Sequence, residues 1–277
     1  MFTTAKFDQI FGYDKVILGL DHAEVRGLGG AIQPHCRKFE LIPELMPSNP
    51  VWKSKLEIYQ PSNDLFPALL SCLGATCRAM PTYAELAWDV ICPDAGQASA
   101  VQDWRLAHLH LLNNRQSVVR HKTVWYYGRR SMPGQGKRGR VLAMYADKPC
   151  KLQGVKDGKY CAHMELRLTG SVALQDVGVF SVADLAALDH IGLWWGTVNL
   201  LKVPDKKTEL GRILHNQPGT AISGTALVNK ANKFLGGYIT EGRFVLENAI
   251  RENKQLAQEL KLIPFAEAIG DSAIRLI

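Results

Sequence analysis

The residues with the clearest potential for chemistry surround a tyrosine, in the run Arg140-Val-Leu-Ala-Met-Tyr145-Ala-Asp-Lys148. A tyrosine hydroxyl is a poor nucleophile at neutral pH because its reference pKa is about 10. A lysine three residues further on and an arginine nearby can stabilise the phenolate and contact a phosphate under attack. The run is typical of a tyrosine nucleophile, Tyr145, assisted by Lys148 and Arg140, although a Tyr-x-x-Lys spacing also arises by chance.

Acidic residues form a second group of candidates. Asp14, Glu57, Glu85 and Glu165 lie within or at the edge of apolar segments of strand length. A charged side chain in such a segment is costly to bury unless it is paired or binds a metal ion. Several converging carboxylates suit a hard cation such as Mg²⁺ or Mn²⁺. Strand alternation leaves another interpretation open, in which each carboxylate simply points to water.

The pair His108 and His110 has the spacing of metal ligands on a strand. The segment 99–113 that contains it has helical periodicity instead. Residues two apart on a helix do not face the same way, so we expect the pair to lie on a helix without binding an ion. A zinc site made of these two histidines and Cys92 has poor spacing.

Positive charge is concentrated in one stretch of the chain. The 277 residues carry a net charge of +7, whereas residues 115–159 hold twelve Lys or Arg against two Asp. That stretch therefore carries +10, and the remainder of the chain carries −3. Such a stretch predicts a polyanion as partner, and the aromatic residues 125–127 within it favour single-stranded nucleic acid. A solvated basic loop is the alternative. The candidate DNA contacts are Arg129, Arg130, Lys137, Arg138 and Trp125.

Strands and helices that would position these residues alternate up to about residue 170. Hydrophobic periodicity and turn residues predict strands at 14–20, 55–59, 83–91, 123–127, 141–145 and 163–168. They predict helices at 66–77, 99–113, 181–188 and 243–262, and a glycine-rich turn at 27–34.

Composition limits the class of protein and the cellular compartment that we expect. With 47% hydrophobic and 21% charged residues, the chain can bury a core. No run approaches the ~18 uncharged apolar residues of a membrane span. The first residues lack the pattern of a secretory signal, and the six cysteines form no Cys-x-x-Cys pair. We therefore expect a cytoplasmic protein with reduced thiols and no membrane partner.

A series of short motifs follows the chain between residues 12 and 170. The series is Leu56-Glu57-Ile58 with Pro61; Glu85-Leu86-Ala87-Trp88-Asp89; Thr123 to Gly128 with Arg129; Tyr145, Asp147 and Lys148; and Glu165 in Met-Glu-Leu-Arg-Leu. In this order the series resembles the rolling-circle replication initiators of the trans-acting plasmid class and the related filamentous-phage replication endonuclease. Each motif is short, so the specificity lies in the order.

The resemblance implies an α+β fold, an antiparallel sheet with helices packed on one face, plus a helix-rich C-terminal part. It implies that residues 1–170 form a DNA-nicking catalytic domain. Residues 171–277 would then serve DNA recognition or dimerisation. The implied partners are origin DNA, single-stranded at the nick, a host helicase and a second copy of the chain.

The resemblance also implies a mechanism. Tyr145 would attack one phosphodiester at the origin and form a 5′-phosphotyrosine link, and the strand would be rejoined after rolling-circle synthesis. A Mg²⁺ or Mn²⁺ ion would be held by Glu85, with Asp14 or Glu165 as co-ligands. The chain departs from the family pattern at Glu85 and Tyr83, where the family has Asp preceded by Arg. The alternative is a non-catalytic DNA-binding regulator on the same scaffold, which needs neither the tyrosine nor the carboxylates.

Overall fold

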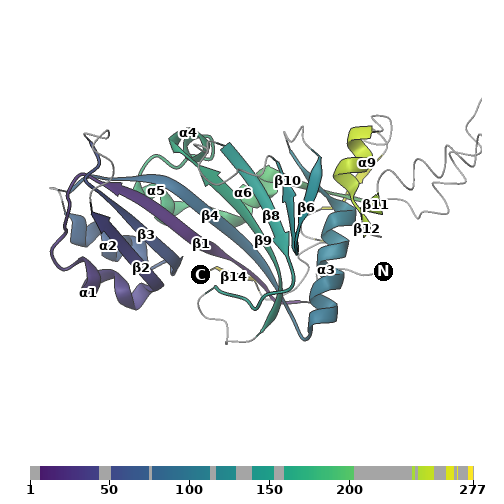
Figure 1. Ribbon diagram of the computed structural model, residues 1–277, viewed down its shortest axis with the longest axis horizontal. Coiled ribbons are helices and arrows are strands. Elements are labelled where there is room, and N and C mark those ends of the chain that lie inside the picture. Colours follow the sequence, from purple (N-terminus) through teal and green to yellow (C-terminus); the bar gives the residue numbers. More distant parts are fainter. Residues whose placement is uncertain are drawn as a thin grey trace, which may run out of the picture.

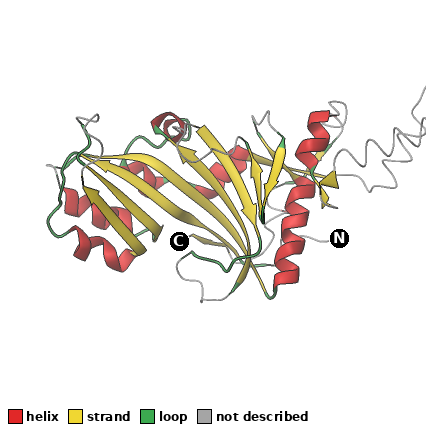
Figure 2. Ribbon diagram, viewed as in Figure 1, coloured by secondary structure: helices red, strands yellow, loops and turns green. Residues whose placement is uncertain are grey.

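The protein is described by a computed structural model, in which strands form one long curved sheet flanked by helices (Figure 1, Figure 2). The structure describes residues 7–43, 51–74, 77–112, 117–128, 139–152, 159–202, 239–240, 243–252, 260–264, 267 and 274–276. Within these ranges, no helix has the length and apolar character that crossing a bilayer requires.

Antiparallel pairing joins eight strands of the main sheet. In spatial order its strands are β2 (Cys36–Pro43), β3 (Ser54–Pro61), β1 (Gln9–Leu20), β4 (Ala79–Cys92), β9 (Tyr160–Thr169), β8 (Gly139–Tyr145), β7 (Val124–Tyr127) and β6 (Val118–His121). The short β14 (Ile274–Leu276) pairs in parallel with the beginning of β1. The candidate tyrosine and carboxylates therefore lie on the central strands.

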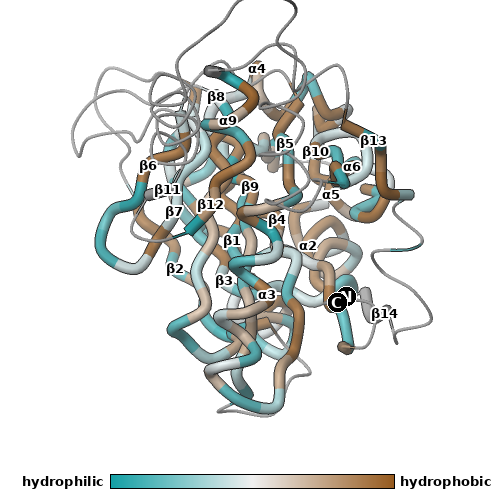
Figure 3. Tube along the Cα trace, turned by 90° about the vertical axis from the view of Figure 1, so that its right-hand side faces the viewer, coloured by the Kyte–Doolittle hydropathy of each residue, from teal (hydrophilic) through white to brown (hydrophobic). Residues whose placement is uncertain are grey.

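Helices and small sheets complete the described part of the chain. The helices are α1 (Leu28–Ile32), α2 (Leu65–Leu73), α3 (Ala95–His108), α4 (Ser171–Gln175), α5 (Val182–Ala187), α6 (His190–Thr197) and α9 (Leu246–Glu252), with a 3₁₀ turn η2 at Gln33–His35. A small sheet contains β5 (Leu109–Leu111), β10 (Val198–Lys202) and β13 (Lys261–Leu262), and a second contains β11 (Ile239–Thr240) and β12 (Arg243–Phe244). Seen from its end, the main sheet has α2, α5 and α6 on one side (Figure 3).

Strand alternation separates a hydrophobic face of the sheet from a polar one. On β4 and β9, the even-numbered side chains from Ala84 to Trp88 and from Met164 to Leu168 pack into the core against the helices. The odd-numbered side chains of the same strands point to the opposite face, which we call the polar face. Leu174 of α4, Val182 of α5 and Trp194 of α6 belong to the same core, so these helices and the sheet share one hydrophobic cluster.

A β-bulge in β1 changes the side-chain alternation within that strand. Tyr13 pairs with Leu86 and Lys15 with Glu85, so Asp14 is the extra residue. Both Tyr13 and Val16 are therefore buried in the core, although they lie three residues apart. The bulge places Asp14 and Lys15 on the polar face together, as bulges near functional sites commonly do.

The predicted α+β class and antiparallel sheet with helices are confirmed. A clearly helix-rich part after residue 170 is not found in the described ranges, because the short helices α4, α5, α6 and α9 share this part of the chain with the strands β10 to β14. The helix predicted at 243–262 is described as β12, α9 and β13 with residues 253–259 outside the described ranges. The turn predicted at 27–34 contains α1, and strands β2 and β6 were not predicted.

His110 corrects the expectation of a single helix over 99–113. Helix α3 ends at His108, and His110 lies on β5. The His108 Nδ1 lies 2.9 Å from the Leu201 carbonyl oxygen, while the His110 Nδ1 lies 2.9 Å from Glu247 Oε1. The two rings thus have different partners, and the pair does not converge on one point.

Arg105 of α3 fastens the helix to the strands that carry the polar face. It is 1% exposed and donates to the backbone oxygens of Ala162 and Trp88 at 2.9 and 3.2 Å. We expect Arg105→Met to lower the free energy of unfolding by about 3 kcal/mol, because two buried carbonyl groups lose their donor. The measurement is urea unfolding followed by circular dichroism. The control Arg78→Met, at a side chain 87% exposed, should cost less than about 0.5 kcal/mol, and equal effects would contradict the prediction.

Candidate active site

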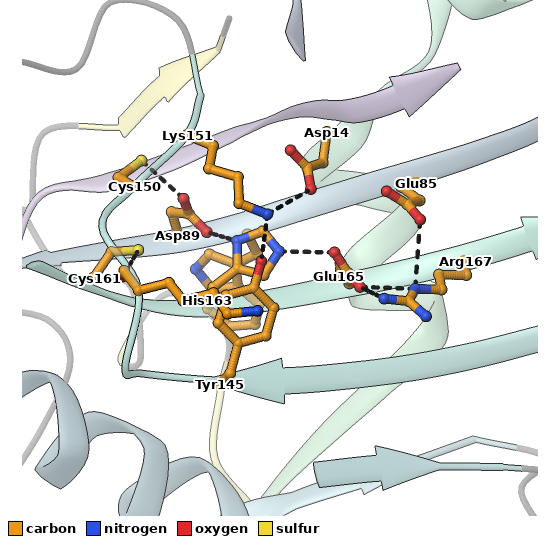
Figure 4. A network of polar contacts seen from close by, with 12 residues as sticks. Asp14, Glu85, Asp89, Tyr145, Cys150, Lys151, Cys161, His163, Glu165 and Arg167 are labelled. Carbon is orange, nitrogen blue, oxygen red and sulfur yellow. Dashed lines mark hydrogen bonds and ion pairs between the residues drawn. The ribbon is translucent and has the colours of Figure 1, made fainter. Parts of the chain in front are cut away.

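Polar side chains from four neighbouring strands converge at the centre of the polar face (Figure 4). His163 of β9 stands in register between Asp89 of β4 and Tyr145 of β8. Two residues further along β9, Glu165 has the same orientation. Asp14, the extra residue of the β1 bulge, lies on the same face. Sheet register therefore brings together a tyrosine, a histidine and three carboxylates.

His163 is enclosed between two carboxylates. Its Nδ1 lies 2.5 Å from Asp89 Oδ1, and its Nε2 lies 3.0 Å from Glu165 Oε2. Burial by itself lowers the pKa of His163, but the charges and hydrogen bonds of Asp89 and Glu165 outweigh it and raise the pKa well above the usual value. The imidazole ring therefore carries a proton on each nitrogen at neutral pH and donates to both carboxylates.

Glu165 is also held by an arginine. Arg167 donates to Glu165 Oε1 from Nε at 2.7 Å and also from Nη2. Burial tends to raise the pKa of Glu165, but His163 and Arg167 together keep it below its usual value. Glu165 is therefore an anion at neutral pH, although it is only 2% exposed.

Glu85 stands beside this group. It accepts a hydrogen bond from the Tyr83 hydroxyl and lies 3.5 Å from Arg167 Nε. Burial and the charge of Glu165 raise the pKa of Glu85 against the opposing effects of Tyr83 and Arg167. Glu85 thus shares Arg167 with Glu165 and has Tyr83 as its closest partner.

Glu57 belongs to a different polar group. Lys15 and Lys55 each lie 2.6 Å from a Glu57 oxygen, and the Tyr59 hydroxyl donates at 2.7 Å. Burial tends to raise the pKa of Glu57, but these donors lower it to about 2. Glu57 is therefore paired with lysines on the polar face rather than pointing freely to water.

Asp14 is oriented from two sides. Gln60 Nε2 donates to the Asp14 backbone oxygen at 3.1 Å and to Oδ1 at 2.5 Å. Gln60 has a φ of 45°, a left-handed conformation that non-glycine residues adopt rarely and at a cost. On the other side, Lys151 Nζ lies 3.9 Å from Asp14 Oδ2. The strained glutamine aims its amide at the carboxylate and fixes it in place.

Tyr145 lies between this carboxylate group and two lysines. Lys151 Nζ donates to its hydroxyl at 3.2 Å, and Lys148 Nζ lies 4.8 Å from its ring centroid. Its ring packs on His163 with 4.4 Å between centroids. Burial, followed by the negative charges of Glu165 and Asp14, raises the pKa of Tyr145 far above its usual value. Without added positive charge the side chain remains a neutral phenol.

Asp14, His163 and Glu165 form a group suited to a divalent cation. Their potential ligand atoms all lie within 4.8 Å of one another. The group offers two carboxylates and one imidazole, and the imidazole shifts the preference from Mg²⁺ toward a transition metal such as Mn²⁺. Asp89 supports the ring from behind through Nδ1, which is the usual outer partner of a ligating histidine. The donor set therefore fits the expected ion.

The structure separates some residues that the sequence placed in one site. Glu85 is not in the three-residue group, whereas Asp14 and Glu165 are. Arg140 lies at the far end of β8, about 17 Å along the strand from Tyr145, and pairs with Asp176 at 3.5 Å. Trp125 is 1% exposed and packs in the core. The remaining predicted DNA contacts lie outside the described residues: Arg129, Arg130, Lys137 and Arg138.

Sequence reasoning missed three residues of the site. His163 begins the predicted strand 163–168, two residues before Glu165, so strand alternation could have placed both on one face. Asp89 stands in the quoted motif Glu-Leu-Ala-Trp-Asp, but its partner His163 lies 74 residues further along the sequence. Lys151 carried no signal, because it follows β8 in a segment without regular structure.

No protein-family model matches the sequence, and no curated protein does. Among solved structures, the chain is similar to "Structure of Rolling Circle Replication Initiator Protein from Geobacillus stearothermophilus". The TM-score is 0.37 and the sequence identity 11%, and the match covers 81% of this chain and 96% of that chain.

The Asp89–His163 pair predicts an unusual titration. We expect the His163 ring in metal-free protein to stay protonated well above the pH at which an ordinary histidine titrates, since both neighbouring carboxylates stabilise its charge. Asp89→Asn should lower the His163 pKa and reduce the free energy of unfolding by about 3 kcal/mol near neutral pH. NMR of the ring resonances against pH measures the first effect, and urea unfolding measures the second. His190 is an internal control, because burial lowers its pKa to about 4.

The sign of the pH dependence follows from the raised pKa. Stabilisation by His163 is fully present below the ordinary value of 6.5 and is lost as the pH rises through the folded-state pKa. The stability difference between wild type and Asp89→Asn should therefore shrink at alkaline pH. A His163 ring that titrates near pH 6.5 in wild type would contradict this account of the site.

Proposed function

We propose that the protein is a metal-dependent DNA strand-nicking and strand-joining enzyme that uses Tyr145 as its nucleophile. The proposal is carried by one observation: the Tyr145 hydroxyl accepts a hydrogen bond from Lys151 at 3.2 Å, directly beside a group of two carboxylates and an imidazole. The +10 charge of residues 115–159, which surround Tyr145 in sequence, supports a nucleic acid as substrate.

In this mechanism Tyr145 Oη forms a bond to a backbone phosphorus, and the bond from that phosphorus to the 3′ oxygen breaks. The phenolic proton passes to solvent water, and the departing 3′ oxygen takes up a proton from solvent water. The 5′-phosphotyrosine retains the energy of the phosphodiester, which allows the strand to be rejoined later. The products are a 3′-hydroxyl primer and a protein-bound 5′ end.

Lys151 stabilises the phenolate through its existing hydrogen bond to the phenolic oxygen. Lys148 is exposed and stands over the ring, where it can contact the incoming phosphate. Asp14, His163 and Glu165 would hold the divalent ion, and Asp89 and Gln60 would orient them. When bound, this ion supplies positive charge that offsets the carboxylates and polarises the phosphate.

We further infer that ionisation of Tyr145 depends more strongly on the cation than ionisation of a solvent-exposed tyrosine would. Tyr145 is 4% exposed, and the nearby carboxylates raise its pKa. Lys151 alone leaves the phenol neutral, so the protein without its ion is expected to be inactive. Origin DNA, rolling-circle replication, a host helicase and a second copy of the chain as partners, and recognition by residues 171–277, remain inferences from the motif series.

The alternative is a DNA-binding regulator without catalytic activity. The burial of Tyr145 and its hydrogen bond with Lys151 favour this alternative, because a tyrosine with a purely structural role would have the same surroundings. Such a protein would keep the basic segment and bind DNA without a metal requirement. Formation of a covalent adduct distinguishes the two.

Tyr145→Phe tests the nucleophile. We expect wild type to form a covalent adduct with single-stranded DNA in Mn²⁺ or Mg²⁺, and the variant to form none, because the attacking oxygen is gone. Denaturing gels of labelled DNA libraries measure the adduct, and EDTA should abolish it. Tyr160→Phe, at a residue 47% exposed, is the matched control. If an adduct still formed with Tyr145→Phe, another residue would be the nucleophile.

Lys151→Met tests the hydrogen bond to the phenol. We expect the rate of adduct formation to fall about 10²-fold, since a charged donor to the developing phenolate is lost. Lys148→Met should reduce it less, because Lys148 contacts the ring rather than the oxygen. Lys202→Met removes an exposed charge from β10 and controls for weaker DNA binding. Single-turnover kinetics give the rates, and equal losses in all three variants would indicate a general charge effect instead.

A further inference from the structure

Next to the candidate active site lies a second group of potential ligands, in which two cysteines have no part in the proposed nicking reaction and Asp89 takes part only as the partner of His163. Asp89 of β4, Cys150 after β8 and Cys161 of β9 are 0%, 7% and 1% exposed. Their ligand atoms all lie within 4.8 Å of one another. The three side chains therefore meet in the interior from three separate segments of the chain.

We propose that Asp89, Cys150 and Cys161 bind a Zn²⁺ ion. Two sulfur ligands and one carboxylate match the preferences of Zn²⁺, whereas Mg²⁺ and Mn²⁺ prefer oxygen. A tetrahedral zinc site separates neighbouring ligand atoms by about 3.5 Å, given metal–ligand bonds of about 2.0–2.3 Å. The three ligand atoms lie within 4.8 Å of one another, with Cys150 Sγ 2.9 Å from Asp89 Oδ2, so an ion could draw them into that geometry. A water molecule would complete the four ligands.

The existing contacts already orient the three side chains. Cys150 Sγ lies 2.9 Å from Asp89 Oδ2, and the Cys161 and Cys150 side chains are hydrogen-bonded to each other. The Cys150 backbone N–H donates to the Lys159 oxygen at 3.0 Å, and the adjacent Pro149 and Tyr160 form a β-bridge. The backbone on both sides of the group is therefore fixed, which reduces the entropy cost of binding an ion.

Surrounding residues enclose the three ligands and place one positive charge near them. Ile10, Ala87 and Leu152 pack around the cysteines and keep them from solvent. The charge of the buried Arg105 acts on both Asp89 and Cys161, so positive charge is present to balance two thiolates and a carboxylate around Zn²⁺. The other oxygen of Asp89 is held by His163 Nδ1 at 2.5 Å, an outer partner typical of ligating groups.

The zinc ligands would lie close in sequence to two residues of the candidate active site. Cys150 directly precedes Lys151, the hydrogen-bond partner of Tyr145, and Cys161 lies two residues before His163. Ligation would fix the segment that carries Lys151. This inference goes beyond the proposed nicking activity and does not depend on it, because the ligands differ from those around Tyr145 apart from the contact of Asp89 with His163.

Cobalt substitution tests the site in the full-length protein, kept reduced with a phosphine. We expect one Co²⁺ to bind with a near-ultraviolet thiolate-to-cobalt charge-transfer band, and Zn²⁺ to displace it. Cys150→Ser and Cys161→Ser should each weaken binding by at least about tenfold, since a sulfur ligand is lost. Cys36→Ser, a buried cysteine elsewhere in the core, should retain the band.

A second group of potential ligands could bind Co²⁺ in place of the proposed site. Asp21, His22 and Cys77 also lie within reach of one another. A band that disappears in Cys77→Ser and persists in Cys150→Ser would overturn the proposal, as would wild-type protein without any such band.

Because the serine variants can misfold, zinc-edge X-ray absorption of wild-type protein gives an independent measurement. Two sulfur ligands with oxygen or nitrogen completing the shell support the site, and one sulfur or none overturns it. The same spectra of Tyr145→Phe should be unchanged, so loss of nicking and loss of zinc are separately observable.

Discussion

Burial of charge on one face of a sheet is the constraint on which this structure depends. Asp89 and Glu165 are almost completely buried, and Asp14 nearly so. Such carboxylates are tolerable only if each has a charged or hydrogen-bonding partner. His163 serves two of them, Gln60 serves Asp14, and Arg167 serves Glu165. The protonated imidazole is thus the central counter-charge of the metal-free protein.

A cation would alter this balance at its centre. For His163 to ligate a metal through Nε2, it must give up the proton that now points to Glu165. Metal binding and the proton on His163 are therefore alternatives, with Asp89 retaining its contact with Nδ1 in either case. Tyr145 is close to the same carboxylates, which raise its pKa. Its capacity to ionise therefore depends on whether a metal ion or the proton on His163 offsets their charge.

Much of the fold could be predicted from local patterns, and much of the site could not. Alternation revealed the strand around Glu57, and flanking prolines bounded the strand around Glu85. β2 was not predicted because it lies at the sheet edge, where its exposed and half-buried residues show no clear alternation of polar and apolar side chains. His110 was assigned to a helix because the periodicity of α3 continues past its true end. Lys148 was chosen by spacing, whereas the path of the chain after β8 brings Lys151 to the phenol.

The bulge in β1 has a consequence for how the protein could be altered by design or by evolution. Because Asp14 is the unpaired residue, the strand before it and the strand after it obey opposite parities. Deleting Asp14 would restore a regular ladder in which Tyr13 and Val16 both still face the core, so the deletion would remove the acid alone. The bulge therefore adds a buried acid to the polar face without disturbing the apolar side chains of β1, and the acid could be gained or lost independently of the residues that fold the strand.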